Sequence, residues 1–188
     1  SHAIIGGYGG AALMKGGIAA IIISGYTKVL LFIFLAPIIG MVMASFFSVA
    51  TLWIVKDMAP RKVDKYFRKL QLVSAAVYSL SHGSNDAQKT IGIITIVLFT
   101  NKLLGDTFFV PYWVIILSHT VIALGTLFGG WKVIKTLGMR VTKLSPFGGF
   151  SAETAAGLTI IGATLGGIPV STTHTITGSI IGVGSVKG

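Results

Sequence analysis

Two polar segments lie within an otherwise apolar chain, and both carry side chains that are able to bind ions. The first, SHGSNDAQKT at residues 81–90, contains Asn85 and Asp86, whose oxygens suit a hard cation. Asp86 is one of only five acidic residues among 188, and an ionised carboxylate in an apolar region is costly unless it is paired or functional. We therefore expect Asn85 and Asp86 to bind a cation, or Asp86 to take up a proton.

The alternative for Asp86 is structural. It would pair with Lys89 as a loop residue, or cap a helix that begins near Ala87. Gly83 just upstream allows the backbone to leave helical geometry, so we expect the helix to be interrupted at SHGSND. Lys89 either pairs with Asp86 or faces the substrate, and the sequence leaves both roles open.

The second polar segment is GGIPVSTTHT, residues 166–175. Its Gly-Gly-Ile-Pro predicts a helix break, after which Ser171, Thr172 and Thr173 open a new helix. The first turn of a helix has unpaired N–H groups and a partial positive charge, which suit an anion, and hydroxyls add donors without adding charge. The alternative is an ordinary N-cap with the other hydroxyls packed against neighbouring helices. Because the break lies in an apolar region, we favour the anion site.

Composition identifies the class of protein that must position these segments. The chain is 53% hydrophobic and only 11% charged, whereas soluble domains carry about 25% charged residues. Val29 to Val55 contains no charge and is long enough to cross a bilayer. We predict a polytopic, all-α integral membrane protein with broken or re-entrant helices. The expected hydrophobic stretches are 3–14 with a weak extension to 24, 29–55, 71–99, 111–130, 148–168 and 169–186.

The net charge of +10 is concentrated in two clusters between apolar stretches. Their members are Lys56, Arg61, Lys62, Lys65, Arg68 and Lys69, and then Lys132, Lys135, Arg140 and Lys143. The positive-inside rule predicts that loops 56–70 and 131–147 are cytoplasmic, and the even number of crossings between them agrees. The charge therefore indicates contact with anionic lipid headgroups and no nucleic-acid partner. The absence of cysteine excludes disulfides.

An internal repeat is also predicted. SHAIIGGYGGAAL at the start aligns with THTITGSIIGVGS from Thr173, and the two copies lie five crossings apart. An odd separation gives them opposite orientations, which is typical of inverted-repeat secondary transporters. The expected organisation is 1–14 as the end of a first repeat, 15–70 as a connecting transmembrane helix and basic loop, and 71–188 as the second repeat.

The remaining ionisable residues are less informative. The four histidines lack the i, i+4 spacing of a helical zinc site, so no metal is expected beyond a sodium site. We expect His2 and His174 to be repeat-related packing residues and His119 to be structural. For Glu153 two roles are equally favoured: an acid at the start of a helix near a basic loop, or a residue of the site.

SHGSNDAQKTIGI, GGIPVSTTHTITGSIIGVG, FGGWKVIKTLG and GFSAETAAG together resemble the inorganic phosphate transporter (PiT) family of bacterial type over essentially the whole chain. The resemblance implies two inverted repeats that each give an Asn-Asp motif and a Ser/Thr-Thr-His motif to a central site. On this sequence it assigns to that site Asn85, Asp86, Ser171, Thr172, Thr173 and, as the remnant of the first repeat, Ser1. We expect Asn85 and Asp86 to bind the cation, and Ser171, Thr172, Thr173 and Ser1 to bind phosphate. The candidate supporting residues are Ser84, Gln88, Lys89, Glu153 and His174. The Asn-Asp motif of the first repeat is absent, so this chain is expected to be a partial transporter.

The expected function is symport of inorganic phosphate with Na⁺ or H⁺ across the cytoplasmic (inner) membrane, without catalytic residues or another cofactor. A cation or proton at Asp86 would relieve its repulsion of the anion, which is the physical basis of coupling. The alternatives are a channel or a transporter of another oxyanion such as sulfate, and a membrane hydrolase that uses Ser81, His82 and Asp86. Free phosphate or a metal–phosphate complex as cargo, and a homo-oligomer, are left open.

Overall fold

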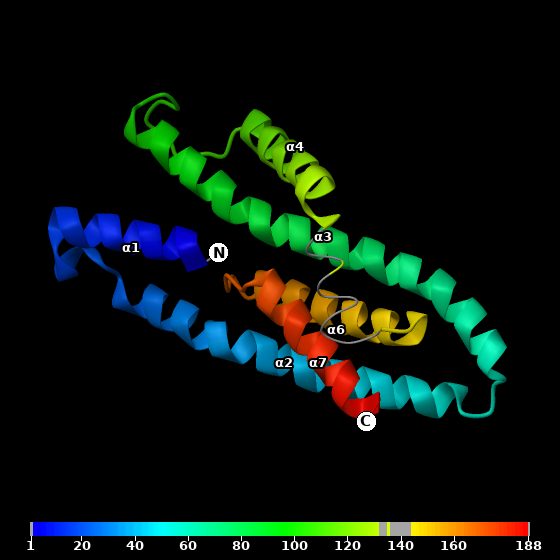
Figure 1. Cartoon of the computed structure of the whole chain (residues 1–188). Coiled ribbons are helices and arrows are strands. Elements are labelled where there is room, and N and C mark those ends of the chain that lie inside the picture. The colour runs from blue at the N-terminus through cyan, green and yellow to red at the C-terminus, as the bar shows by residue number, and fades with distance from the viewer. Residues whose placement is uncertain (1, 132–134, 136–143, 188) are drawn as a thin grey trace.

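The structure is a computed structural model that describes residues 2–131, 135 and 144–187 (Figure 1). All regular elements in these residues are helical, and α2 and α4 are long and apolar enough to cross a membrane. The predicted all-α membrane fold is confirmed. The elements are α1 (His2–Gly16), the 3₁₀ helix η1 (Ile18–Ala20), α2 (Ile23–Val55), α3 (Pro60–Thr100), α4 (Tyr112–Gly129), α6 (Pro146–Leu165) and α7 (Thr172–Lys187).

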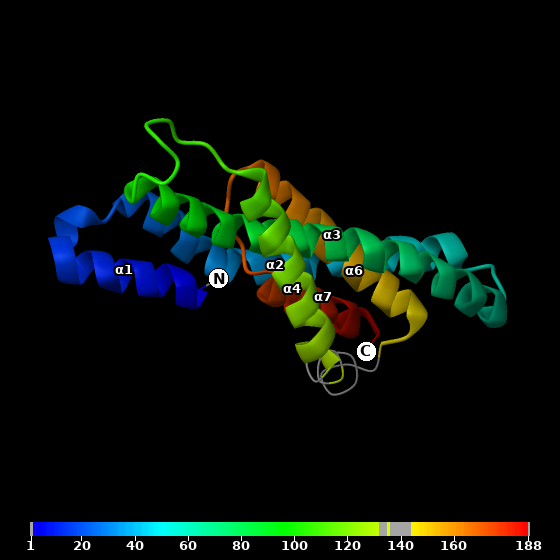
Figure 2. The same ribbon diagram turned by 90° about the horizontal axis from the view of Figure 1, so that it is seen from above.

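Two long helices frame the molecule. α2 and α3 run in opposite directions, α6 and α7 fill the space between them, and α4 packs on the outer side of α3 (Figure 1, Figure 2). α3 has 41 residues, which corresponds to about 60 Å, or roughly twice the apolar thickness of a bilayer. α3 is therefore long enough to carry a charged end outside the membrane and a polar site within it.

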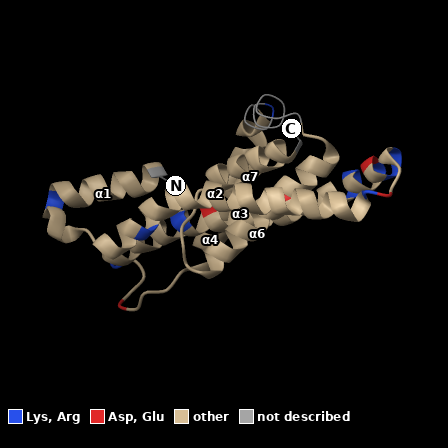
Figure 3. Ribbon diagram, turned by 90° about the horizontal axis from the view of Figure 1, so that it is seen from below, with Lys and Arg blue, Asp and Glu red and all other residues tan. Residues whose placement is uncertain are grey.

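The charged end of α3 corrects the prediction of a basic loop at 56–70. Only residues 56–59 connect the two long helices, and five of the six basic residues of this cluster lie in α3 itself. Pro60 starts the helix, where its fixed φ and missing N–H are tolerated, and Lys and Arg are good helix formers. Figure 3 shows Lys and Arg gathered at this end of the molecule. Most of the second expected loop, 131–147, lies outside the described residues.

α3 is continuous through the SHGSND segment, so the predicted interruption of the helix there is wrong. Ser81 donates from Oγ to the carbonyl of Val77 at 2.7 Å, which is a bond within the helix. In an apolar environment an unpaired backbone amide costs several kcal/mol, whereas Gly83 destabilises a continuous helix by only about 1 kcal/mol, so the helix continues. The structural alternative that Asp86 caps a helix starting near Ala87 is excluded for the same reason.

The expected helix break within the second polar segment is confirmed. α6 ends at Leu165, α7 begins at Thr172, and Gly167 has φ +65°, a conformation that favours glycine. α6 itself begins at Pro146, with Ser145 as N-cap accepting from the N–H of Gly148 at 3.3 Å.

Two other predictions differ from the structure. α2 begins at Ile23 rather than near residue 29, and Glu153 lies two turns inside α6 rather than at the start of a helix.

The middle of α7 packs unusually closely against α2, which holds the helix in place. A Cβ atom added to Gly178 or Gly182 would collide with the main-chain carbonyl of Pro37 or Met41. The hydroxyl of Ser179 donates to the carbonyl of Gly40 at 3.1 Å, which is possible because the backbones approach so closely. Small residues at such positions are typical of helix pairs in membranes, where packing replaces the hydrophobic effect as the driving force.

The close approach predicts the effect of adding one methyl group. Gly178→Ala should destabilise the protein by about 1–3 kcal/mol, because the main chain of α2 must move to admit it. Thermal unfolding in detergent micelles measures the loss. Gly125→Ala is the control, since its Cβ meets open space, and it should be neutral or mildly stabilising. Equal midpoints for the two variants would contradict the packing.

Candidate functional site

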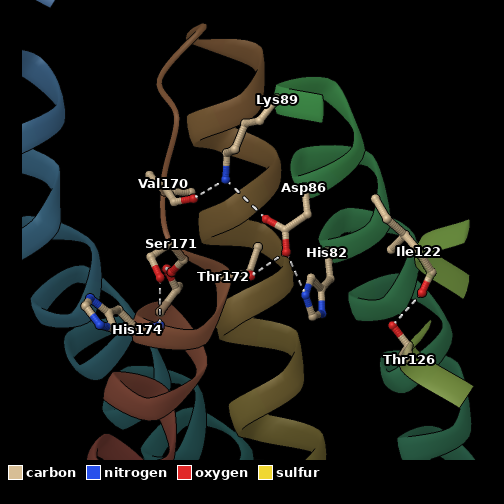
Figure 4. A network of polar contacts seen from close by, with 10 residues as sticks. His82, Asp86, Lys89, Ile122, Thr126, Val170, Ser171, Thr172 and His174 are labelled. Carbon is tan, nitrogen blue, oxygen red and sulfur yellow. Dashed lines mark hydrogen bonds and ion pairs between the residues drawn. The ribbon is translucent and has the colours of Figure 1, made fainter. Parts of the chain in front are cut away.

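Asp86 is the centre of a polar cluster that joins α3 to the start of α7 (Figure 4). Its Oδ1 accepts a hydrogen bond from Lys89 Nζ at 3.1 Å, and its Oδ2 accepts one from Thr172 Oγ1 at 3.2 Å. His82 Nε2 lies 2.9 Å from the same Oδ2. His82, Asp86 and Lys89 meet because they are three or four residues apart on one helix. The carboxylate is therefore held by its own helix on two sides and by α7 on the third.

The two polar segments of the sequence are thus in direct contact. Thr172 is the first residue of α7 and only 2% exposed, so its contact with Asp86 is part of the packed interior. Ser171 precedes it, and its Oγ accepts from the N–H of His174 at 3.4 Å, in the manner of an N-cap. The N-cap alternative therefore describes Ser171, while the buried hydroxyl of Thr172 points across to α3.

Lys89 links the same carboxylate to the main chain of the α6–α7 connection. Its Nζ donates to the carbonyl of Val170 at 2.8 Å, and its side chain is 13% exposed. Pairing with Asp86, one of the two roles left open by the sequence, is what the structure shows. The pair also balances the site electrically, because one ammonium and one carboxylate cancel within a largely apolar region.

Asn85 points from α3 towards α6 rather than α7. The residue is 3% exposed, and its Nδ2 donates to Thr164 Oγ1 at 2.9 Å. Its Oδ1 is buried and accepts no hydrogen bond from the part of the chain that the structure describes. A buried carbonyl oxygen without a donor is costly, so this atom is a candidate ligand for a cation.

The other predicted site residues are not part of this cluster. Ser84 and Gln88 on α3, and Thr173 and His174 on α7, are exposed, and Ser1 lies outside the described residues. An open groove of about 260 Å³ between α3 and α6 includes Ser84, but most of its lining is apolar, which does not suit an anion.

Glu153 belongs to a separate polar contact between α3 and α6. Its Oε2 accepts a hydrogen bond from Ser74 Oγ at 2.6 Å, and Gln71 is a second partner. Ser74 and Asp86 are twelve residues apart on one straight helix, or about 18 Å. The structure therefore does not bring Glu153 to Asp86.

Three partners of the site were not assigned to it from the sequence: Thr164, the carbonyl of Val170, and His82, which was placed beside Asp86 only in the hydrolase alternative. His82 is four residues before Asp86, a spacing that identifies a neighbour only if the segment is helical. No sequence signal identifies Thr164 or the carbonyl, because both contacts are made between helices.

The contact between Asn85 and Thr164 predicts a measurable contribution to stability. Thr164→Val leaves the buried Nδ2 of Asn85 without its acceptor and should cost about 1–3 kcal/mol, whereas Thr164→Ser should retain most of the stability. Thermal unfolding is the measurement. Thr159→Val is the matched control on α6, because that hydroxyl bonds to the carbonyl of Ala155 in its own helix. An equal loss at 159 and 164 would argue against the contact.

Fold and site together define an all-helical membrane protein with a charge-balanced polar centre beside a broken helix. The profile of the phosphate transporter family matches residues 54–188. The whole chain is 51% identical to a "Probable low-affinity inorganic phosphate transporter" of Rhizobium meliloti (strain 1021) and 44% identical to one of Bacillus subtilis (strain 168). The chain belongs to the phosphate transporter family, and it spans 56% and 57% of the length of these two relatives.

A solved structure supports the fold. It is described as "The sodium-dependent phosphate transporter", and it matches with a TM-score of 0.75 over 94% of this chain and 61% of its own. Sequence identity is 21%, so this likeness concerns the arrangement of helices.

Proposed function

We propose that the protein takes part in cation-coupled transport of inorganic phosphate, with the anion at the start of α7 and the cation at Asn85 and Asp86. The observation that carries the proposal is the contact of Thr172 with Asp86, because it joins an anion-binding helix start to a carboxylate. The names of the relatives support phosphate as the substrate. Since this chain spans a little over half of their length, it supplies part of the complete transporter.

The anion would bind to the first turn of α7 and to the hydroxyls of Ser171, Thr172 and Thr173. The N–H groups at a helix start and the helix dipole favour negative charge at this point. The nearby Asp86 distinguishes phosphate from sulfate, because a protonated phosphate oxygen donates a hydrogen bond to a carboxylate and sulfate has no proton to donate. Phosphate is thus the better substrate for this set of donors and acceptors.

The cation would bind to the carboxylate of Asp86 and the buried Oδ1 of Asn85, which is without a donor in the described residues. Carboxylate and amide oxygens suit a hard cation, and a proton on Asp86 is the other way to remove its charge. The structural neighbour is described as sodium-dependent, which supports Na⁺ as the coupling ion. Coupling would arise in a state in which Asp86 is not paired with Lys89, because an uncompensated carboxylate repels the anion strongly in a site of low dielectric.

The complete transporter would alternate access to this site by rocking of two inverted repeats, of which residues 71–188 form the second and residues 1–14 the end of the first. α1 and α7, which contain the two copies of the repeated motif, run in roughly opposite directions in Figure 1, in keeping with this scheme. The basic end of α3 would face the cytoplasm on the inner membrane. Both the repeat and the orientation remain predictions.

Asp86→Asn tests the cation site. In the full-length natural protein it should lower cation-dependent phosphate uptake by roughly tenfold or more, because the neutral amide no longer attracts Na⁺ or accepts H⁺. Uptake of labelled phosphate into proteoliposomes under separate Na⁺ and pH gradients is the measurement. Asp57→Asn, on the exposed connection between α2 and α3, is the control. Unchanged uptake and unchanged cation dependence in Asp86→Asn would refute the assignment.

Thr173→Val tests the anion site. Loss of one neutral donor should raise the half-saturating phosphate concentration roughly three- to tenfold, and phosphate should remain preferred over sulfate as a competitor. Thr177→Val, one turn further along α7, is the matched control and should have little effect. A similar change in both variants, or equal competition by sulfate, would contradict a phosphate site at the helix start.

A further inference from the structure

Lys89 lies where a metal cation would be expected. Its Nζ is 3.1 Å from Asp86 Oδ1 and 2.8 Å from the carbonyl oxygen of Val170. A carboxylate together with a main-chain carbonyl at a helix break is the type of oxygen set that coordinates Na⁺ in transporters with discontinuous helices. In this conformation the two oxygens are bridged by an ammonium group of the protein itself (Figure 4).

The Val170 carbonyl is constrained to face this position. Val170 lies in the connection between α6 and α7, outside either helix, so its carbonyl has no place in a helical ladder. Its side chain is 1% exposed and packs with Ala36, Ile160 and Ala163, which fixes the orientation of the residue. A buried carbonyl needs a positively polarised partner, and Lys89 provides it.

We propose that Lys89 is a tethered cation that occupies the sodium position at Asp86, and that a free sodium ion binds there only after displacing the ammonium group. The inference rests on the proposed function for its role in transport, but the competition between Lys89 and Na⁺ can be measured without phosphate. On this proposal Lys89 determines how strongly anion binding at the site depends on the coupling ion.

The competition has a direct consequence for binding. A group attached to the same helix, three residues from the carboxylate, competes at a high effective concentration, so the apparent affinity for free Na⁺ is low. While Lys89 is in place, the charge of Asp86 is already balanced, and an anion at α7 is not repelled by a bare carboxylate. Anion binding in this conformation therefore depends only weakly on Na⁺.

The decisive experiment compares Lys89→Gln and Lys89→Met with Lys89→Arg, which keeps the positive charge. Binding of labelled Na⁺ to the purified full-length protein should tighten roughly tenfold in the two neutral variants, the scale of one charge-assisted hydrogen bond, and should stay weak in Lys89→Arg. Lys28→Gln is the control, because this exposed lysine lies on α2. The neutral variants should also gain thermal stability on addition of Na⁺, which reports binding even if their basal stability is reduced.

Phosphate uptake separates this inference from the proposed function. In proteoliposomes the neutral variants should show a much steeper dependence on Na⁺ than the unmodified protein. The inference is overturned if Lys89→Gln and Lys89→Met bind Na⁺ with unchanged or weaker affinity. A lower phosphate affinity with unchanged Na⁺ binding would also overturn it, because Lys89 would then be a phosphate ligand. Absence of phosphate uptake by the unmodified protein would instead refute the proposed function, while tighter Na⁺ binding by the neutral variants would still support the tethered cation.

Discussion

The charge of Asp86 is the constraint on which the arrangement of the helices depends. A carboxylate within an apolar protein must be compensated, and here the compensation comes from two chain segments that are more than eighty residues apart in sequence. α3 provides His82 and Lys89 because it stays helical. The connection between α6 and α7 provides the carbonyl of Val170, and the first residue of α7 provides the hydroxyl of Thr172, so polar atoms at the helix break are used at the carboxylate.

The polar centre is positioned by apolar packing of unusual closeness. Gly178 and Gly182 bring α7 against the main chain of α2, and the hydroxyl of Ser179 reaches the carbonyl of Gly40 across that contact. α7 also packs on α6, and α6 in turn packs on α3. The distance between the start of α7 and Asp86 is consequently determined by a chain of contacts through three helices, which suits a site whose ligands must be placed accurately.

The sequence was sufficient to predict the helical membrane class, the break at Gly166–Pro169 and the family, because hydrophobic length, Gly-Pro chemistry and long motifs are local signals. It was misleading for SHGSND, where glycine and small polar residues have low helix propensity in isolation. Tertiary partners of Asn85 and Asp86 and the need to satisfy each backbone amide outweigh that propensity. The contact of Asn85 with Thr164 and the separation of Glu153 from Asp86 depend on how helices pack, which no spacing in the sequence specifies.

The uninterrupted course of α3 has a mechanical consequence. Asp86 lies 26 residues after Pro60, or about 39 Å along a single rod, with the basic residues at its outer end. A tilt of such a rigid helix at its charged end would displace the carboxylate relative to α7, and His82 and Lys89 would move with it as one body. The α6–α7 connection, where Gly167 has a positive φ, lies outside either helix, so a tilt of α3 would be absorbed there without melting a helix.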